Sequence, residues 1–323
     1  MNDHLLSCDW GTSTFRLLLL HTPTSRVEAV IQTDNGNAAM YQHWLDQGRP
    51  ERASFYRSYL QQQVKALSRT CRHALEGLPL MLSGMSSSSI GLCELPYDEL
   101  PFELDGQLPG HRYFEATNEF PNPIWVFTGL KSATDVMRGE EMQVLGLFPA
   151  LPEARQTAIC IFPGTHSKHI QLHAGRILDF HTYMTGEMFQ LMGHHSILKA
   201  SVEMAQTDNT GISPHFAQGV KVGAQTPLLN ALFHVRSRQL LQGEAAADNA
   251  QFLSGLLIGS ELSTLKDPKA AIVLCAGKKL SPHYRAALDA LALPHRCLPA
   301  SAVEQAVSSG HIRLAAALGI CSA

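Results

Sequence analysis

The chain has 323 residues, of which 45% are hydrophobic, and its 25 Lys and Arg against 28 Asp and Glu give a net charge of −3. This length and composition exclude an intrinsically disordered protein and predict two domains. No basic run is present, so we expect no nucleic-acid partner. Charged residues are only 16% of the chain, which favours either a homo-oligomer that covers part of the surface or a surface rich in His and Gln.

The sequence gives no targeting or membrane signal. The N-terminus lacks a basic segment, and the longest apolar stretch, 252–262, is interrupted by Ser and Gly and is too short to span a bilayer. The seven cysteines are scattered without a Cys-x-x-Cys pair, which predicts buried thiols in a reducing compartment and neither a zinc site nor a disulfide framework. We therefore expect a soluble, cytoplasmic protein without a membrane partner.

The first half of the chain opens on a predicted hairpin. Residues 5–8 and 15–20 are apolar strands, and the polar segment 9–14 is the turn between them. Apolar residues then recur at helical spacing over 51–76, which predicts one long amphipathic helix. The remaining elements predicted in this half are a strand at 80–82, a ligand-facing polar loop at 83–89, a strand at 124–127 and a helix at 139–147.

Two prolines within 148–153 mark a predicted boundary between an N-terminal domain, 1–150, and a C-terminal domain, 151–323. The second half begins as the first does, and its predicted elements are a strand at 158–162, a turn at 163–167, a strand at 168–172, helices within 186–265, a strand at 271–274, a helix at 282–293, a strand at 296–298 and a helix at 302–318. Strands that alternate with helices in both halves predict an α/β fold.

The tip of each predicted hairpin carries a Gly-Thr turn. Glycine lets an anion approach consecutive backbone N–H groups, so two such turns predict a polyphosphate site. The alternative is that each Gly-Thr pair only forms the turn of its hairpin and binds no ligand. The candidate phosphate-binding residues are Gly11, Thr12 and Ser13 in the first turn and Gly164, Thr165 and His166 in the second.

Three carboxylates are candidates for chemistry. Asp9 follows an apolar strand and is suited either to hold Mg²⁺ or to cap the turn. Glu140 and Glu141 begin a predicted helix after Arg138, where a carboxylate can accept a proton and an arginine can bind an acidic substrate. The alternative is that these glutamates are solvated and simply suit the helix dipole.

A third glycine turn joins the strand at 271–274 to the helix at 282–293. Gly277 and Lys278 lie in it, where glycine allows adenine or phosphate to approach and lysine offsets negative charge. Strand-glycine-helix turns are common in α/β proteins, so this signal is weak alone. The sequence contains no P-loop, no dinucleotide fingerprint and no His-Glu-x-x-His, which excludes the enzyme classes that those motifs mark.

The order of these segments resembles that in the sugar-kinase branch of the actin/hexokinase/Hsp70 ATPase superfamily. Their amino-acid sequences are similar to those of the 2-dehydro-3-deoxygalactonokinase family. The resemblance covers nearly the whole chain. The segments that carry it are Asp-Trp-Gly-Thr-Ser at 9–13, Val-Met-Arg-Gly-Glu-Glu-Met-Gln at 136–143, Pro-Gly-Thr-His-Ser-Lys at 163–168, Met-Thr-Gly-Glu at 184–187 and Phe-Leu-Ser-Gly-Leu-Leu-Ile-Gly at 252–259.

The resemblance implies two actin-like (ribonuclease H-like) domains with a central cleft, and a last helix that returns to the first domain. It also implies that ATP phosphorylates the 6-hydroxyl of 2-dehydro-3-deoxy-D-galactonate, with Mg²⁺, in galactonate catabolism. The resemblance implies that Glu140 is the general base, with Glu141 as the other candidate, and that Asp9 is a magnesium ligand. It implies that the two Gly-Thr turns bind phosphate and that Gly277 and Lys278 lie near adenosine. It also implies that Arg138 binds the substrate carboxylate and that the sugar-acid pocket is lined by Gly36, Gly84 and Met85.

The sequence departs from the family at 91–97, where Gly-Leu-Cys-Glu-Leu-Pro-Tyr stands in place of a stretch that often carries Gly-Trp. The stereochemistry of the sugar acid therefore stays open. Two other functions of the same fold also stay open: a phosphohydrolase acting on polyphosphate or nucleotides, and an actin-like assembly protein gated by a nucleotide.

Overall fold

The computed structural model describes residues 3–71, 73–204, 212–265 and 270–321. Contacts within the chain divide it into two compact units. Unit 1 comprises Met1–Pro152, Gly175–Ile177 and Glu304–Ala323, and unit 2 comprises Glu153–Ala174 and Leu178–Val303. Part of the predicted helical region, 205–211, lies outside the described residues. Within the described ranges, no helix has the length and hydropathy needed to cross a membrane.

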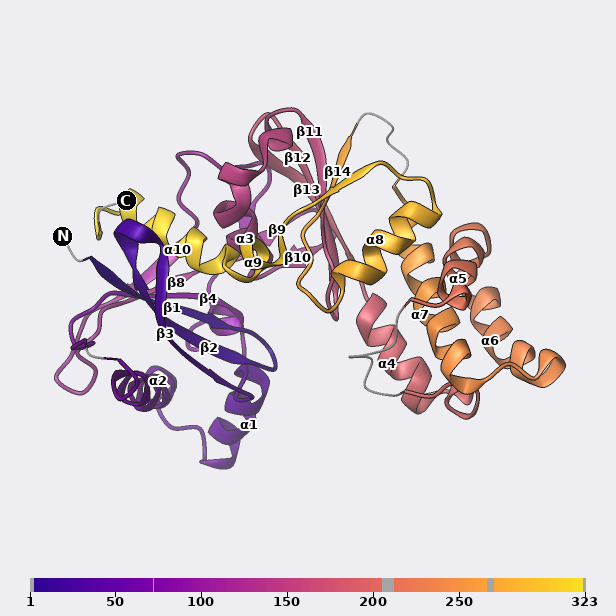
Figure 1. Ribbon diagram of the computed structural model, residues 1–323. Coiled ribbons are helices and arrows are strands. Elements are labelled where there is room, and N and C mark those ends of the chain that lie inside the picture. Colours follow the sequence, from indigo (N-terminus) through magenta and orange to yellow (C-terminus); the bar gives the residue numbers. More distant parts are fainter. Residues whose placement is uncertain (1–2, 72, 205–211, 266–269, 322–323) are drawn as a thin grey trace. The chain divides into compact units, whose positions relative to one another are not determined.

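Unit 1 is built on a six-stranded sheet with the order β3-β2-β1-β4-β8-β7 (Figure 1). The first three strands form an antiparallel meander, and β4 and β8 then continue parallel to β1. This order is the ribonuclease H-like order. The strands are β1 (His4–Trp10), β2 (Phe15–His21), β3 (Arg26–Thr33), β4 (Leu80–Gly84), β7 (His111–Phe114) and β8 (Ile124–Phe127), with β5 (Asp98–Glu99), β9 (Leu130–Lys131) and β10 (Val136–Met137) in a small second sheet.

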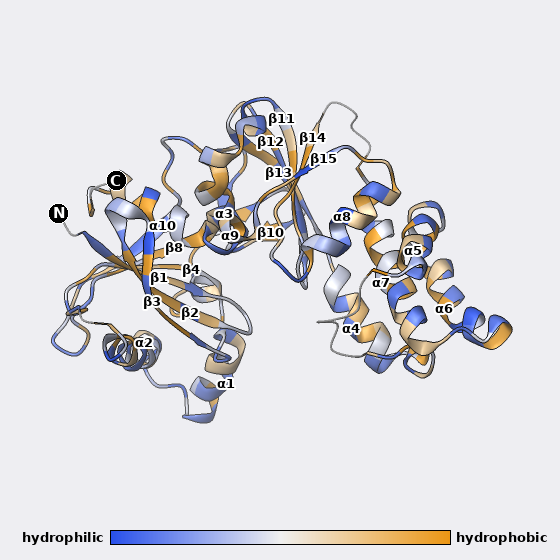
Figure 2. Ribbon diagram, in the orientation of Figure 1, coloured by the Kyte–Doolittle hydropathy of each residue, from blue (hydrophilic) through white to orange (hydrophobic). Residues whose placement is uncertain are grey.

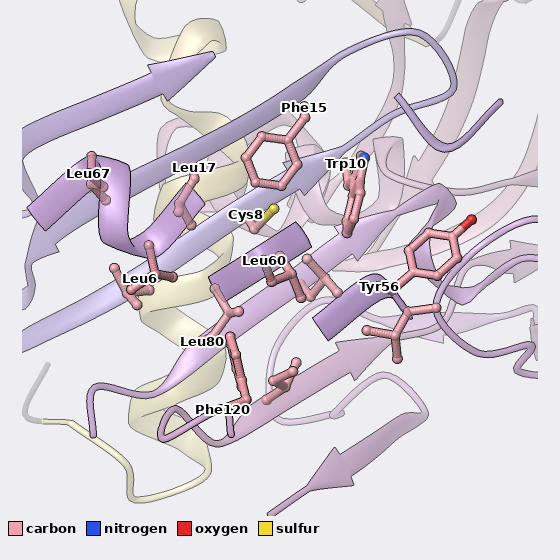
Figure 3. Close-up of a cluster of buried hydrophobic side chains, with 14 of the residues drawn as sticks. Leu6, Cys8, Trp10, Phe15, Leu17, Tyr56, Leu60, Leu67, Leu80 and Phe120 are labelled. Atoms are coloured by element: carbon pink, nitrogen blue, oxygen red, sulfur yellow. The ribbon is translucent and has the colours of Figure 1, made fainter. Parts of the chain in front are cut away.

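The core of unit 1 lies between its main sheet and helix α2, as Figure 3 shows. Trp10 at the end of β1 packs edge-on against Phe15 with ring centroids 5.0 Å apart, and Tyr56 and Leu60 of α2 are buried in the same cluster. Burial of such large side chains stabilises the strands whose ends carry the first Gly-Thr turn. The helices of unit 1 are α1 (Asn37–Asp46), α2 (Arg52–Ser68), α3 (Glu140–Leu147) and α10 (Ala306–Ala317).

Helix α3, which begins at Glu140, is fixed by close packing against α10. A Cβ atom on Gly146 would lie 1.8 Å from the carbonyl oxygen of Ala306, and one on Gly310 would lie 2.6 Å from that of Met142. Only glycine permits backbones to approach so closely. The chain's last helix therefore supports the helix that carries the candidate catalytic carboxylates.

Five strands of a second six-stranded sheet repeat the order of β3-β2-β1-β4-β8. This sheet has the order β15-β14-β11-β12-β13-β6, in which β11 pairs antiparallel with β12, and β14 and β15 run parallel to β11. Its sixth strand, β6, pairs with Arg176 and Ile177 of β13, and these residues are grouped with unit 1, whereas the rest of the sheet belongs to unit 2. Two α/β units with the ribonuclease H-like order confirm the predicted fold class, two actin-like units. The strands are β6 (Phe102–Glu103), β11 (Thr157–Phe162), β12 (Ser167–His173), β13 (Arg176–Tyr183), β14 (Ala271–Leu274) and β15 (His295–Cys297).

The helices of unit 2 pack on one another through α7, which is buried along most of its length. Glycines let α5 approach it, since a Cβ atom on Gly223 would lie 1.9 Å from the carbonyl oxygen of Leu256. Figure 2 shows both hydrophilic and hydrophobic residues on the outer helices α5 and α6. The helices are α4 (Thr185–His195), α5 (Pro214–Gln225), α6 (Leu228–Gln242), α7 (Ala246–Leu262), α8 (Ser281–Ala290) and α9 (Ala300–Glu304).

The helix predicted over 51–76 and the last predicted helix differ most from the structure, and the helix predicted over 282–293 ends at Ala290. The helix expected over 51–76 ends at Ser68, where the Ser68 hydroxyl donates to the carbonyl of Lys65 and the Thr70 hydroxyl to that of Leu67. Side chains that bond to the last carbonyls in this way compete with continuation of the helix. The last predicted helix is divided into α9 and α10. Asp9, expected in the turn, is the penultimate residue of β1.

Candidate active site

The first Gly-Thr turn is held by the start of helix α1. The Gly11 N–H donates to the carbonyl of Thr14 across the turn, and the N–H groups of Asn37 and Ala38 donate to the carbonyls of Gly11 and Thr12. Side chains of Thr12 and Ser13 are exposed, so the tip of the turn is open to a ligand. The residue before α1 is Gly36, and only glycine fits at this position, because a Cβ atom there would lie 2.3 Å from the Thr12 carbonyl oxygen.

Asp9 lies where the carboxyl ends of two parallel strands meet, since it pairs in register with Ser83 of β4. Such strand ends are the usual ligand site of α/β sheets. Gly84 follows with φ 81°, and a Cβ atom on it would lie 2.8 Å from the Trp10 carbonyl and 3.3 Å from a carboxylate oxygen of Asp9. Burial raises the pKa of Asp9 to about 6, Arg16 opposes this rise, and the charge of Glu140 adds to it.

Helix α3 brings its first turn to the same place. Gly139 has φ 111°, and a Cβ atom on it would lie 3.6 Å from Cα of Gly84. The structure therefore brings together Asp9, Gly84 and the start of α3. Sequence reasoning placed all three in one site without showing this contact.

Glu140 and Glu141 have different surroundings. The Glu141 side chain is 1% exposed, and both its carboxylate oxygens accept the Gly139 N–H at 2.8 Å. Burial, with a smaller contribution from the nearby charge of Glu140, raises the pKa of Glu141 to about 8, and the Gly139 hydrogen bond opposes this rise. Glu140 is partly exposed. Glu141 thus fixes the turn before α3, whereas Glu140 is the carboxylate that solvent or a ligand can reach.

Arg138 is bound to the loop that follows Gly84. Its guanidinium donates to the Ser87 hydroxyl at 2.6 Å and to the Leu95 carbonyl at 2.9 Å. It also lies over the Tyr97 ring, 3.9 Å from the centroid, in a cation–π contact. Met85 begins the short turn that contains Ser87. Arg138 therefore holds the loop that contains Met85, one of the residues expected in the sugar-acid pocket, and that follows Gly84.

The second Gly-Thr turn, in unit 2, is held by the start of helix α4. The N–H of Glu187 donates to the carbonyl of Thr165, and the Glu187 carboxylate lies 2.5 Å from Nε2 of His166. A Cβ atom on Gly186 would lie 2.6 Å from the Gly164 carbonyl oxygen. The glycine of the Thr-Gly-Glu segment is therefore required by the direct contact between α4 and the turn.

A buried hydrogen-bond network lies beneath this turn. The Gly164 N–H donates to the Ser167 hydroxyl at 3.4 Å, that hydroxyl bonds to the Tyr284 hydroxyl at 2.8 Å, and Tyr284 donates to the Glu261 carboxylate at 2.7 Å. His169 lies 2.9 Å from the other oxygen of Glu261. Thr185, the first residue of α4, also donates to Glu261. One carboxylate of α7 thus joins the turn, α4 and α8. Sequence analysis assigned no role to Glu261 or Tyr284.

A cavity of about 1060 Å³ adjoins the second turn within unit 2. Gly164 and Thr165 line one part of it, and Lys278 lines another. Gly277 precedes Lys278, and a Cβ atom on it would meet nothing within 4 Å. Apolar side chains from α4, α7 and the segment before α8 also line the cavity, namely Phe189, Leu257, Ile258 and Leu280. A cavity lined by both apolar side chains and polar groups suits a ligand with a flat ring and a charged tail.

Comparisons with known proteins agree with this architecture. A family model for 2-keto-3-deoxy-galactonokinase matches residues 9–313. The chain belongs to the 2-keto-3-deoxy-galactonokinase family. A relative from Rhizobium meliloti named as a 2-dehydro-3-deoxygalactonokinase is 33% identical over 312 residues, covering 94% of this chain and 93% of that protein. The 2-dehydro-3-deoxygalactonokinase of Escherichia coli is 33% identical over 226 residues, covering 67% of this chain and 72% of that protein.

A solved structure shows the same likeness in three dimensions. A protein from Sinorhizobium meliloti, described as a 2-dehydro-3-deoxygalactonokinase, superposes with a TM-score of 0.82 at 30% identity, over 99% of this chain and 98% of that one. The predicted family and the predicted enzyme class, a kinase, are thereby confirmed. The two other functions that the sequence left open, the phosphohydrolase and the assembly protein, gain no support from these relatives.

Proposed function

We propose that this member of the 2-keto-3-deoxy-galactonokinase family transfers the γ-phosphoryl group of ATP to the 6-hydroxyl of 2-dehydro-3-deoxy-D-galactonate. ATP binding is supported by the cavity of unit 2, which is lined by Gly164, Thr165 and Lys278. The acceptor part is supported by the names of the relatives. Phosphoryl transfer asks a protein mainly for positioning and charge stabilisation, and we assign the Gly-Thr turn of each unit to phosphate and one carboxylate to proton transfer.

The nucleotide is assigned to the cavity on the chemistry of its walls. Adenine fits between the apolar side chains of α7 and the segment that carries Lys278, where Gly277 leaves room beside the backbone. The phosphates extend toward Gly164 and Thr165, whose backbone N–H groups suit an anion. The backbone N–H of His166 is assigned to the phosphates as well, and the contact of its ring with Glu187 keeps the side chain at the turn.

Mg²⁺ accompanies ATP in this proposal, and Asp9 fits the ion. A carboxylate oxygen is the ligand type that Mg²⁺ prefers. Burial and the charge of Glu140 both work against the ionised form of Asp9, so a nearby cation would stabilise that form. When bound, the ion would offset the negative charge of the phosphates. Gly11, Thr12 and Ser13 lie just beyond Asp9 and are assigned to phosphate.

Glu140 is the general base in this proposal. It is partly exposed and begins the helix that meets Gly84, so it can accept the proton of the attacking 6-hydroxyl. Glu141 is less suited, because it is buried and both its oxygens are bonded to Gly139. Its role is to hold the turn that places Glu140.

The sugar acid is assigned to the pocket region of Gly36, Gly84 and Met85. Arg138 contacts the loop that follows Gly84, where its guanidinium donates hydrogen bonds to the Ser87 hydroxyl and the Leu95 carbonyl. The Nε atom of Arg138 is buried without a hydrogen-bond partner. We therefore assign two tasks to Arg138: to hold the loop around the acceptor and to attract the carboxylate of the substrate.

Replacing Glu140 tests the proposal. Glu140→Gln keeps the size of the side chain but removes the base, and we expect kcat to fall by about 10²- to 10⁴-fold in a coupled ADP-release assay. Glu115→Gln, at an exposed glutamate of the same unit, is the control and should retain wild-type kcat. A Glu140→Gln protein with wild-type turnover would remove Glu140 from the role of base.

A further inference from the structure

Imidazole and carboxylate side chains meet on unit 1 at the edge where β1 begins. His4 is the first residue of β1, Glu28 lies on β3, and His73 follows α2. The same Glu28 oxygen, Oε2, lies 3.1 Å from Nε2 of His4 and 3.1 Å from Nε2 of His73. The His4 and His73 rings lie with their centroids 4.4 Å apart. Three elements distant in sequence therefore direct ligand-type atoms to one point.

The spacing of these atoms matches a metal centre. The ligand atoms of His4, Glu28 and His73 all lie within 4.8 Å of one another. In a tetrahedral zinc site with bonds near 2.0 Å, neighbouring ligand atoms are separated by about 3.3 Å. The side chains are 21%, 25% and 45% exposed, so water can reach the group and complete the coordination. We propose that His4, Glu28 and His73 form a binding site for a divalent transition-metal ion of the Zn²⁺ type.

The donor set selects the class of ion. Two imidazole nitrogens and one carboxylate favour Zn²⁺ and its transition-metal neighbours, whereas Mg²⁺ prefers oxygen ligands. The proposed site is also separate from Asp9. His4 and Asp9 both lie on β1, and the rise per residue of a strand places them roughly 17 Å apart. An ion bound here would join β1, β3 and the segment after α2, and it would stabilise unit 1 without entering the phosphoryl-transfer site.

A second group of similar composition is less suited to a metal. His215, Glu244 and Asp248 of unit 2 also lie within 4.8 Å of one another. The guanidinium of Arg238, however, lies 3.0 Å from the Glu244 carboxylate and 3.1 Å from Nδ1 of His215. A positive charge already contacts two members of this group and would repel a metal ion there. This group therefore serves as an internal comparison.

The test is Zn²⁺ binding by the untagged full-length protein after treatment with EDTA. We expect one Zn²⁺ per chain in calorimetric titration and a higher unfolding temperature by tryptophan fluorescence, because the ion binds the folded state. Co²⁺ in place of Zn²⁺ should give the visible absorption of a tetrahedral centre. His73→Gln removes one ligand at an exposed position and should weaken Zn²⁺ binding by at least the roughly 10–100-fold that loss of a supporting group costs.

Two controls decide between sites. His181→Gln changes an exposed histidine 3.9 Å from the carboxylate of Asp179 and should leave Zn²⁺ binding unchanged. His215→Gln should also leave it unchanged. The proposal is overturned if the wild-type protein takes up no Zn²⁺, if His73→Gln and His4→Gln bind it as tightly as wild type, or if only His215→Gln loses it.

Discussion

Replacing Glu141 by Gln should change how the stability of unit 1 depends on pH. Burial raises the pKa of Glu141 from 4.5 to about 8. The folded state therefore retains a proton that the unfolded chain releases, and the wild-type protein loses stability as pH rises from about 4.5 to about 8. Glutamine has no such titration, and its amide oxygen can still accept the Gly139 N–H.

The magnitude follows from the two pKa values. A carboxyl group whose pKa moves from 4.5 to about 8 contributes about 4 kcal/mol to the change in unfolding free energy between about pH 5 and about pH 8.5. The difference in unfolding free energy between Glu141→Gln and wild type should shift by this amount in favour of the variant. Asp9, with its pKa raised to about 6, titrates in both proteins and so cancels.

Urea unfolding followed by tryptophan fluorescence is the assay. The protein has three tryptophans, Trp10, Trp44 and Trp125, and all of them lie in unit 1 together with Glu141. Their emission therefore reports the unit that contains the substitution, and EDTA in the buffer keeps cations from the carboxylates. A stability difference that is the same at both pH values would show that Glu141 has an ordinary pKa in the folded protein and would refute the reasoning.

Three further substitutions test the contacts around the phosphates and the acceptor. Gly186→Ala places a Cβ atom 2.6 Å from the Gly164 carbonyl; KM for ATP should rise at least about tenfold as α4 leaves the turn, and an unchanged KM would separate this turn from ATP. Tyr284→Phe removes the hydroxyl between Ser167 and Glu261 and should lower the stability of unit 2 by about 1–3 kcal/mol in circular dichroism; equal stability would contradict the network. Arg138→Lys should raise KM for the sugar acid but not for ATP in steady-state kinetics, because lysine lacks the fork geometry; equal effects on both would remove its acceptor role.

The features that sequence reasoning predicted well are local. Each Gly-Thr turn is bounded by apolar strands only a few residues away, and the hairpins of β1–β2 and β11–β12 follow from that pattern alone. The family resemblance depends on the same short segments. The helix over 51–76 was predicted too long because Cys71 and Leu75 continue the apolar spacing and pack on the core without being helical.

The contacts that join distant segments could not be predicted in this way. Glu261, Tyr284 and His169 lie far apart in sequence, and each resembles an ordinary helix or strand residue until the fold brings them together beneath the second turn. The same is true of Gly139 and Gly84, whose closeness places Glu140 beside Asp9. Burial, which separates the chemistry of Glu141 from that of Glu140, is likewise a property of the packed structure.

The most direct test of the central claim is ADP release with Mg·ATP and a panel of acceptors: 2-dehydro-3-deoxy acids of galactonate and gluconate configuration, the parent aldonates, neutral hexoses, and no acceptor. We predict turnover confined to the 2-dehydro-3-deoxy acids, with the galacto isomer preferred and one phosphorylated sugar acid formed per ADP. ADP release that is independent of an acceptor, or no ADP release with any of the acids, would contradict it.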